Sequence, residues 1–103
     1  MTENNFCVFV LSHGRADNVR TVESLHKHGY TGEVVIVIDD EDSQRDEYYD
    51  NFPRVEMFNK AETVKTFDIG DNFSGDKSIV YARNACFDIA KRLNYTYFIE
   101  LDD

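Results

Sequence analysis

Two uninterrupted apolar runs constrain the fold of this chain more than any other feature. Residues Phe6–Leu11 and Val34–Ile38 are apolar at every position, a pattern typical of β-strands that are buried on both faces. The run Val55–Phe58 predicts a weaker strand, and the aromatic and β-branched stretch Tyr95–Leu101 predicts another buried strand. Strands of this kind need cover on both faces of their sheet.

Amphipathic segments between the runs predict helices that supply this cover. After the first run, Val19, Val22 and Leu25 recur at helical spacing. Asp17 is the expected N-cap of this helix and Gly29 its terminator. The first two strands should therefore be joined by a helix.

Further helices are predicted along the rest of the chain. Ser43 and Asp46 resemble a capping box, which would open a short helix that stops at Pro53. Residues 60–67 predict one or two helical turns, and residues 70–77 have the composition of a loop. The strongest helix follows that loop and ends near Asn94, with apolar positions at Ile79, Ala82, Cys86, Ile89, Ala90 and Leu93.

The order of these elements predicts the fold class and the position of a site. All-apolar strands that alternate with helices indicate an α/β fold, a parallel and Rossmann-like sheet with helices on both faces. Ligands of such sheets bind outside the carboxyl ends of the strands. Two adjacent acids at the end of an apolar strand favour a divalent cation held by oxygen ligands. Polar groups follow every predicted strand: Ser12–Arg15, Asp39–Asp40, Asn59–Lys60 and Asp102–Asp103.

Composition narrows the environment and the partners. The length of 103 residues suits one domain, and the net charge of −9 argues against a grip on nucleic acid phosphates by this segment. Cys7 and Cys86 lie far apart within apolar patterns, which predicts two buried, reduced thiols and neither a disulfide nor a zinc site. The sequence shows no signal-peptide pattern and no membrane-length apolar stretch. We therefore expect a cytoplasmic protein without a membrane partner.

Several common signatures are missing from the sequence. It has no G-x-x-x-x-G-K-[ST], no G-x-G-x-x-G after the first strand and no G-x-S-x-G. Ser12 and His13 stand where receiver domains and haloacid-dehalogenase-type phosphatases place an acid. Two interpretations stay open at this point: a non-catalytic α/β module that binds a partner through its sheet edge, and a metal-dependent phosphoesterase.

Three segments together resemble glycosyltransferases of the GT-A fold. Residues 79–86 place Ala82-Arg83-Asn84 near a helix start, and residues 97–103 form a strand that leads into acids, as in a D-x-D motif. The stretches 10–15 and 30–42 look closer still to the phage TET-associated glycosyltransferases, which decorate modified pyrimidines in DNA. The resemblance spans nearly the whole chain.

The resemblance implies roles for eight residues. Asp39 would accept hydrogen bonds from the base or ribose of a nucleotide, and Arg15 would be one partner of its diphosphate. Asp102 and Asp103 would coordinate Mn²⁺ or Mg²⁺ against the two phosphates, although a third acid of the motif is missing. The nucleotide-sugar-binding set is Ser12, His13, Gly14, Arg15, Asp39 and Arg83.

The resemblance also implies what the chain does. We expect residues 1–103 to be the nucleotide-sugar-binding half of a GT-A-like domain, truncated at the D-x-D motif and without its catalytic base. The complete enzyme would bind a nucleoside diphosphate sugar, most simply UDP-glucose, and transfer the hexose to a hydroxyl acceptor. A hydroxymethylated base in phage DNA, held by the missing half, is the acceptor that the resemblance suggests.

Overall fold

A computed structural model describes residues 5–66 and 78–103 of the chain. The predicted alternation of strands and helices is confirmed in this part, and the predicted loop at residues 70–77 lies outside it. The elements are β1 (Phe6–Leu11), α1 (Arg20–Lys27), β2 (Glu33–Asp39), α2 (Arg45–Asn51), β3 (Val55–Phe58), α3 (Lys60–Thr66), α4 (Ser78–Arg92) and β4 (Tyr97–Asp102).

The described residues form one four-stranded sheet in the order β3-β2-β1-β4. Every neighbouring pair is parallel, and Val10 in the centre lies beside Ile36 of β2 and Leu101 of β4. Because the strands share one direction, their carboxyl ends lie along the same edge of the sheet, which we call the carboxyl rim. The predicted parallel α/β fold is confirmed.

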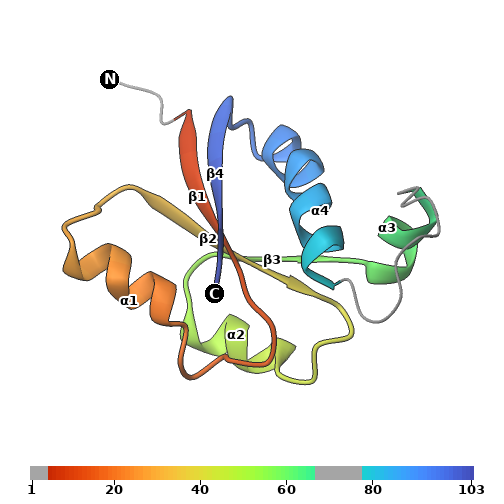
Figure 1. Cartoon of the computed structure of the whole chain (residues 1–103), viewed down its shortest axis with the longest axis horizontal. Helices are drawn as coiled ribbons and strands as arrows, with labels where there is room; N and C mark the ends of the chain where they lie inside the picture. Colours follow the sequence, from red (N-terminus) through yellow and green to blue (C-terminus); the bar gives the residue numbers. More distant parts are fainter. Residues whose placement is uncertain (1–4, 67–77) are drawn as a thin grey trace.

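Helices cover both faces of the sheet, as predicted (Figure 1). Successive strand residues point to opposite faces, so Phe9, Val35 and Val37 pack toward α4. Val10 and Ile36 pack instead toward α1 and α2, where Tyr48 is among the buried partners. The uninterrupted apolar runs of β1 and β2 thus supply core residues to both faces of the sheet.

Residues with positive φ end two of the helices, as the sequence predicts. At Gly29, with φ of 90°, the amide of Tyr30 reaches back to the Leu25 carbonyl at 2.9 Å. At Asn94, with φ of 66°, the amide of Tyr95 makes the same kind of bond to Ala90 at 2.9 Å. Both ends have the hydrogen bonding of a Schellman motif.

The predicted helix starts are wrong in detail. α1 begins at Arg20 with Val19 as its N-cap, because a turn closed by the Asn18 amide and the Arg15 carbonyl occupies the chain around Asp17. α2 has Gln44 as its N-cap, so the capping box of Ser43 is not formed. The carboxylate of Asp42 accepts the Gln44 amide instead, at 2.9 Å.

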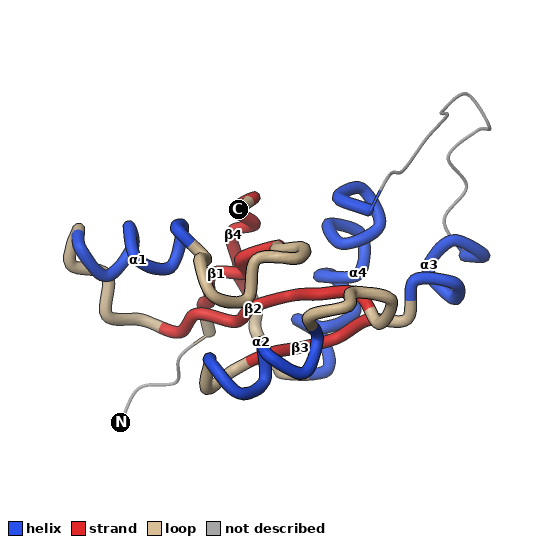
Figure 2. Tube along the Cα trace, turned by 90° about the horizontal axis from the view of Figure 1, so that it is seen from below, coloured by secondary structure: helices blue, strands red, loops and turns tan. Residues whose placement is uncertain are grey.

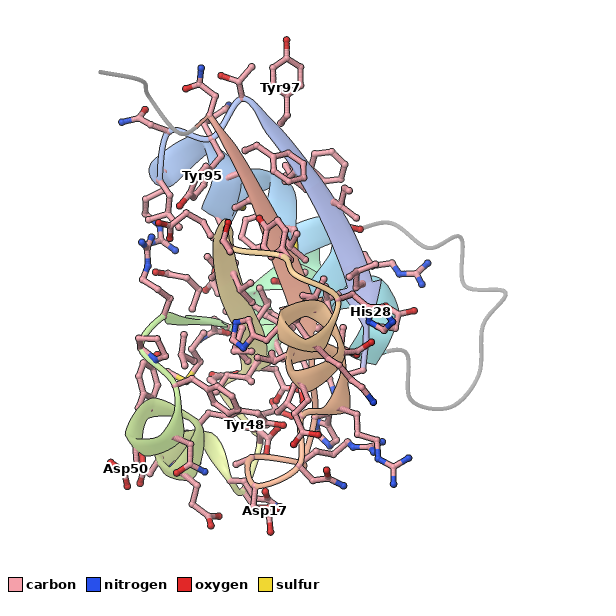
Figure 3. The ribbon with its side chains drawn as sticks, turned by 90° about the vertical axis from the view of Figure 1, so that its left-hand side faces the viewer. Asp17, His28, Tyr48, Asp50, Tyr95 and Tyr97 are labelled. Atoms are coloured by element: carbon pink, nitrogen blue, oxygen red, sulfur yellow. The ribbon has the colours of Figure 1, made fainter. Side chains whose placement is uncertain are left out.

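β4 is less buried than its sequence predicts. Within the described residues β4 has β1 on one side and no strand on the other, and none of its residues is fully buried. Tyr97 and Ile99 are exposed, and Tyr97 points away from the molecule at the start of the strand (Figure 3). α1 and α2 cover the two central strands, β1 and β2, and leave the face of β4 that carries Tyr97 and Ile99 open to solvent.

Two further expectations concern the thiols and the membrane. Cys7 and Cys86 are buried and free, as predicted. None of the helices in the described ranges is long and apolar enough to cross a membrane.

Candidate functional site

Buried polar side chains gather at the carboxyl rim. Among the described residues, the buried polar or charged ones are Ser12, Asp39 and Asp42. Ser12 directly follows β1, Asp39 is the last residue of β2, and Asp42 lies just after β2. The side chain of Asp103, directly after β4, is also only 2% exposed. Burying a carboxylate costs free energy unless hydrogen-bond donors contact it. The donors around these acids therefore indicate which of them are free to bind a ligand.

An open cavity of about 170 Å³ lies at this rim. Its apolar lining comes from Leu11, Val37, Phe58 and Ala82, on the α4 side of the sheet. Sites that enclose a whole ligand usually measure about 300–1,000 Å³, so this cavity suits one part of a nucleotide, such as its base. Five predicted site residues form the polar lining: Ser12, His13, Arg15, Asp39 and Asp103.

Asp39 is held in place at the end of β2. Its Oδ1 accepts the amide of Glu41 at 2.8 Å, and its Oδ2 lies 3.4 Å from Nδ1 of His13. The same ring nitrogen lies 3.5 Å from Oδ2 of Asp42. His13, which is largely exposed, therefore stands between two buried carboxylates at the edge of the cavity.

Asp102 and Asp103 leave β4 on opposite faces because strand residues alternate in direction. The end of β4 lies between α1 and α4 (Figure 2). Asp102 pairs with Arg83 of α4, and this hydrogen bond raises the pKa of the Arg83 guanidinium. Asp103 turns toward α1, where its Oδ1 accepts the Thr21 amide at 3.0 Å and the Thr21 hydroxyl at 2.9 Å.

The two acids are therefore not equivalent as metal ligands. Oδ2 of Asp103 faces the Ser12 hydroxyl and Nε of Arg15, each at 3.5 Å, so both oxygens of this carboxylate have partners. The side chain of Asp102 is 42% exposed at the rim. In the part of the chain that the structure describes, no three His, Cys, Asp or Glu side chains gather around one point as a cation site. Carboxylate oxygens suit Mg²⁺ or Mn²⁺, and of the two acids Asp102 is the more exposed one, although Arg83 pairs with it.

Four polar side chains whose surroundings stand out in the structure were missed by sequence reasoning. Asp42 was one acid in a run of four, and Gln44 carried no pattern at all. Tyr48 lies in the short helix predicted to stop at Pro53 and was given no role in the site, although its hydroxyl hydrogen-bonds with Ser12 and accepts the Arg15 amide. Glu100 is a fourth such case. Burial raises the pKa of its carboxyl, and its Oε2 is buried without a hydrogen-bond partner in the described structure.

A comparison of the sequence with protein families shows which family the chain belongs to. The sequence profile of the TET-associated glycosyltransferases matches residues 6–103. The chain belongs to the TET-associated glycosyltransferase family. Comparisons with curated proteins and with solved structures give no match. The matched range holds β1 to β4 and every residue predicted for the site, so the carboxyl rim of this glycosyltransferase is its candidate active site.

Proposed function

We propose that this glycosyltransferase chain binds a nucleoside diphosphate sugar at the carboxyl rim, most simply UDP-glucose, for transfer of the hexose to a hydroxyl acceptor. One observation carries the proposal: residues from three separate strands converge on one cavity. Ser12 and Asp103, which lie within 3.5 Å of each other, are 91 positions apart in the chain. Asp39 lines the same cavity from the end of β2.

The lining of the cavity suits a nucleobase. Leu11, Val37, Phe58 and Ala82 offer an apolar surface for a flat ring. Carboxylate oxygens accept hydrogen bonds, so Asp39 suits a base or ribose that presents an N–H or O–H. The ring of uracil presents one such N–H group.

Positive side chains beside the cavity suit a diphosphate. Arg15 is part of the lining, and Arg83 lies at the neighbouring end of β4 beside Asp102. Guanidinium groups match phosphate oxygens in a bidentate manner. We assign both arginines to the diphosphate.

A divalent cation, Mn²⁺ or Mg²⁺, is part of the proposal. Mg²⁺ in proteins is often held by one or two carboxylates, with water and substrate phosphates as the other ligands, and Asp102 can serve as such a carboxylate. Bound there, the cation would neutralise charge that develops on the nucleoside diphosphate as it leaves. Asp103 would support the site by holding Arg15 and Ser12.

For the acceptor we propose a hydroxymethylated base in phage DNA, on the basis of the family resemblance. DNA binding requires clustered positive charge, and this chain has a net charge of −9. We therefore assign the DNA contacts to a surface outside residues 1–103, in the enzyme or in a partner.

Calorimetric titration with UDP in the presence of Mn²⁺ tests the proposal. We expect binding by the parent chain, a loss of at least about tenfold in affinity for Asp39→Ala, and loss of the Mn²⁺ dependence for Asp102→Ala. Asp50→Ala removes an exposed acid of α2 and should change nothing. A folded parent chain without affinity for UDP would contradict the proposal, as would an Asp39→Ala variant with unchanged affinity.

A second candidate function is an interaction module, and the exposed edge of β4 favours it. Tyr97 and Ile99 are exposed on a strand whose outer side pairs with nothing in the described structure, and such edges invite pairing with another chain. Sedimentation equilibrium distinguishes the two candidates. Self-association that Ile99→Lys abolishes, in a chain that binds neither UDP nor Mn²⁺, would favour the module.

A further inference from the structure

The loop that follows β1 is held by side chains from a different part of the chain. We call residues 12–16 the β1 loop. The amides of residues 14, 15 and 16 each donate to a side chain of the segment 42–51: to Oδ2 of Asp42, Oη of Tyr48 and Oε1 of Gln44, each at 2.8 Å. Three consecutive amides thus find their acceptors in the region of α2.

The carbonyls of the β1 loop are held from the same region. Nε2 of Gln44 donates to the Gly14 carbonyl at 3.0 Å, and Nδ2 of Asn51 donates to the Ala16 carbonyl at 2.8 Å. Gly14 has a φ of 64°, which glycine adopts without a steric penalty. The conformation of the loop is therefore imposed by its surroundings.

This arrangement limits how the β1 loop can meet an anion. In many phosphate sites, free backbone amides of a loop or helix start point at the ligand. Here the amides of Gly14, Arg15 and Ala16 already have acceptors. The loop can thus offer a diphosphate its side chains, and Arg15 carries the positive charge among them.

Tyr48 occupies the central position in these contacts. Its side chain is fully buried, with 0% exposure, while its hydroxyl lies 2.7 Å from Oγ of Ser12 and 2.8 Å from the Arg15 amide. Burial raises the pKa of this phenol above its ordinary value, so the hydroxyl keeps its proton at neutral pH. One oxygen atom of α2 therefore contacts the chain on both sides of His13, at Ser12 and at Arg15.

We propose that Tyr48 is a positioning residue for nucleotide-sugar binding: through its hydroxyl it sets where the side chains of Ser12, His13 and Arg15 stand at the cavity. The inference rests on the proposed function of the carboxyl rim. Packing alone would be satisfied by phenylalanine, since the ring lies among apolar neighbours. The hydroxyl is needed only for its bonds to the β1 loop.

The replacement Tyr48→Phe removes this one oxygen and leaves the Arg15 amide without its acceptor. The matched control is Tyr49→Phe, the same change at the next position of α2, where the side chain is 48% exposed. Affinities for UDP and for uridine are measured by calorimetry or NMR on variants shown to be folded. Uridine lacks the diphosphate that Arg15 is assigned to hold, while Asp39 belongs to β2 and its Oδ1 is held by the Glu41 amide, outside the loop.

For Tyr48→Phe we expect an affinity for UDP that is about tenfold lower and an affinity for uridine that stays within about twofold. Amide hydrogen exchange at Arg15 should become faster in this variant, and Tyr49→Phe should change none of the three measurements. Equal losses for both probes would assign Tyr48 a merely structural role. Unchanged UDP affinity in folded Tyr48→Phe would overturn the proposal.

A second variant covers the case in which Tyr48→Phe does not fold. Gln44→Ala removes the acceptor of the Ala16 amide from a partly exposed position, and we expect the same preferential loss of UDP affinity, which Gln44→Glu partly restores because it keeps an acceptor oxygen. No loss for Gln44→Ala would contradict the inference. If the parent chain binds neither UDP nor uridine, the proposed function fails. The role of the Tyr48 hydroxyl is tested separately by amide hydrogen exchange at Arg15. An unchanged exchange rate in Tyr48→Phe would show that the hydroxyl does not hold the loop.

Discussion

Asp103 caps helix α1 from the far end of the described chain through Thr21. Its Oδ1 accepts both the amide and the hydroxyl of Thr21, which lies 82 positions earlier in the first turn of α1. Amides in that turn have no partner within the helix, and Val19 at the N-cap has no polar side-chain atom to offer. A carboxylate there also meets the positive end of the helix dipole. This contact ties β4 to α1.

The first prediction separates the two terminal acids by stability. Asp103→Ala should lower the free energy of unfolding by about 1–2 kcal/mol, the usual effect of losing a helix cap, as measured by urea denaturation. Asp102→Ala removes the neighbouring, exposed carboxylate and should change the stability little, because exposed ion pairs contribute little. Combining Asp103→Ala with Thr21→Val should destabilise by less than the sum of the two single effects. Equal effects of Asp102→Ala and Asp103→Ala would contradict the assignment.

Much of the fold could be predicted because the signals are local. β1 and the stretch Val34–Ile38 of β2 are apolar at every position, and Gly29 and Asn94 take the left-handed conformation that ends a helix. Parallel topology then places the residues that follow each strand at one rim. The convergence of Asp39, the β1 loop and Asp103 follows from this topology, without any knowledge of side-chain contacts.

The details of the site depend on contacts that are distant in sequence. The start of α1 was placed at Asp17 because a short polar residue before an apolar pattern predicts a cap, yet the carboxylate that meets the helix is Asp103. Tyr48 gives no local signal for its contacts, because its ring is buried among apolar neighbours and only its hydroxyl reaches the β1 loop. Only the opposite directions of Asp102 and Asp103 had a local signal, the two-residue period of a strand.

The second prediction concerns Asp42, which is buried and holds two amides. Its Oδ2 accepts the Gly14 amide at 2.8 Å and its Oδ1 accepts the Gln44 amide at 2.9 Å. Asp42→Ala leaves both donors unsatisfied and should lower the free energy of unfolding by about 2–4 kcal/mol. Asp46→Ala, an exposed acid in the first turn of α2, serves as the control and should have a much smaller effect. Chemical denaturation of both variants checks this, and similar losses would argue against the role of Asp42.

The third prediction concerns the reactivity of the two thiols. Burial raises the pKa of Cys7 to about 11 and raises the pKa of Cys86 further. Thiolates are the reactive form, so the native chain should react with iodoacetamide at pH 8 far more slowly than the same chain in denaturant. Mass spectrometry of the alkylated protein measures both sites. Rapid alkylation of either thiol in the native chain would contradict this account.

The fourth prediction follows from the carboxyl of Glu100. Burial raises its pKa, while a hydrogen bond from the Cys86 thiol and the charge of Arg83 lower it by less. In the unfolded chain a glutamate titrates near about 4.3, so between that pH and the raised value the folded chain binds more protons. Stability must then fall as the pH rises through this interval. Glu100→Gln cannot titrate and avoids the buried charge.

The Glu100→Gln chain should therefore unfold at a higher temperature than the parent at pH 7. The difference should shrink as the pH falls to about 4 and below, where the parent carboxyl becomes protonated in both states. Thermal unfolding followed by circular dichroism across this range measures the effect. Glu47→Gln makes the same change at an exposed position of α2 and should show no comparable gain. Glu100→Gln would be less stable at pH 7 if the Arg83 charge outweighed the loss of hydration at Glu100. The sign of the difference at pH 7 thus decides which of the two effects dominates beneath the rim.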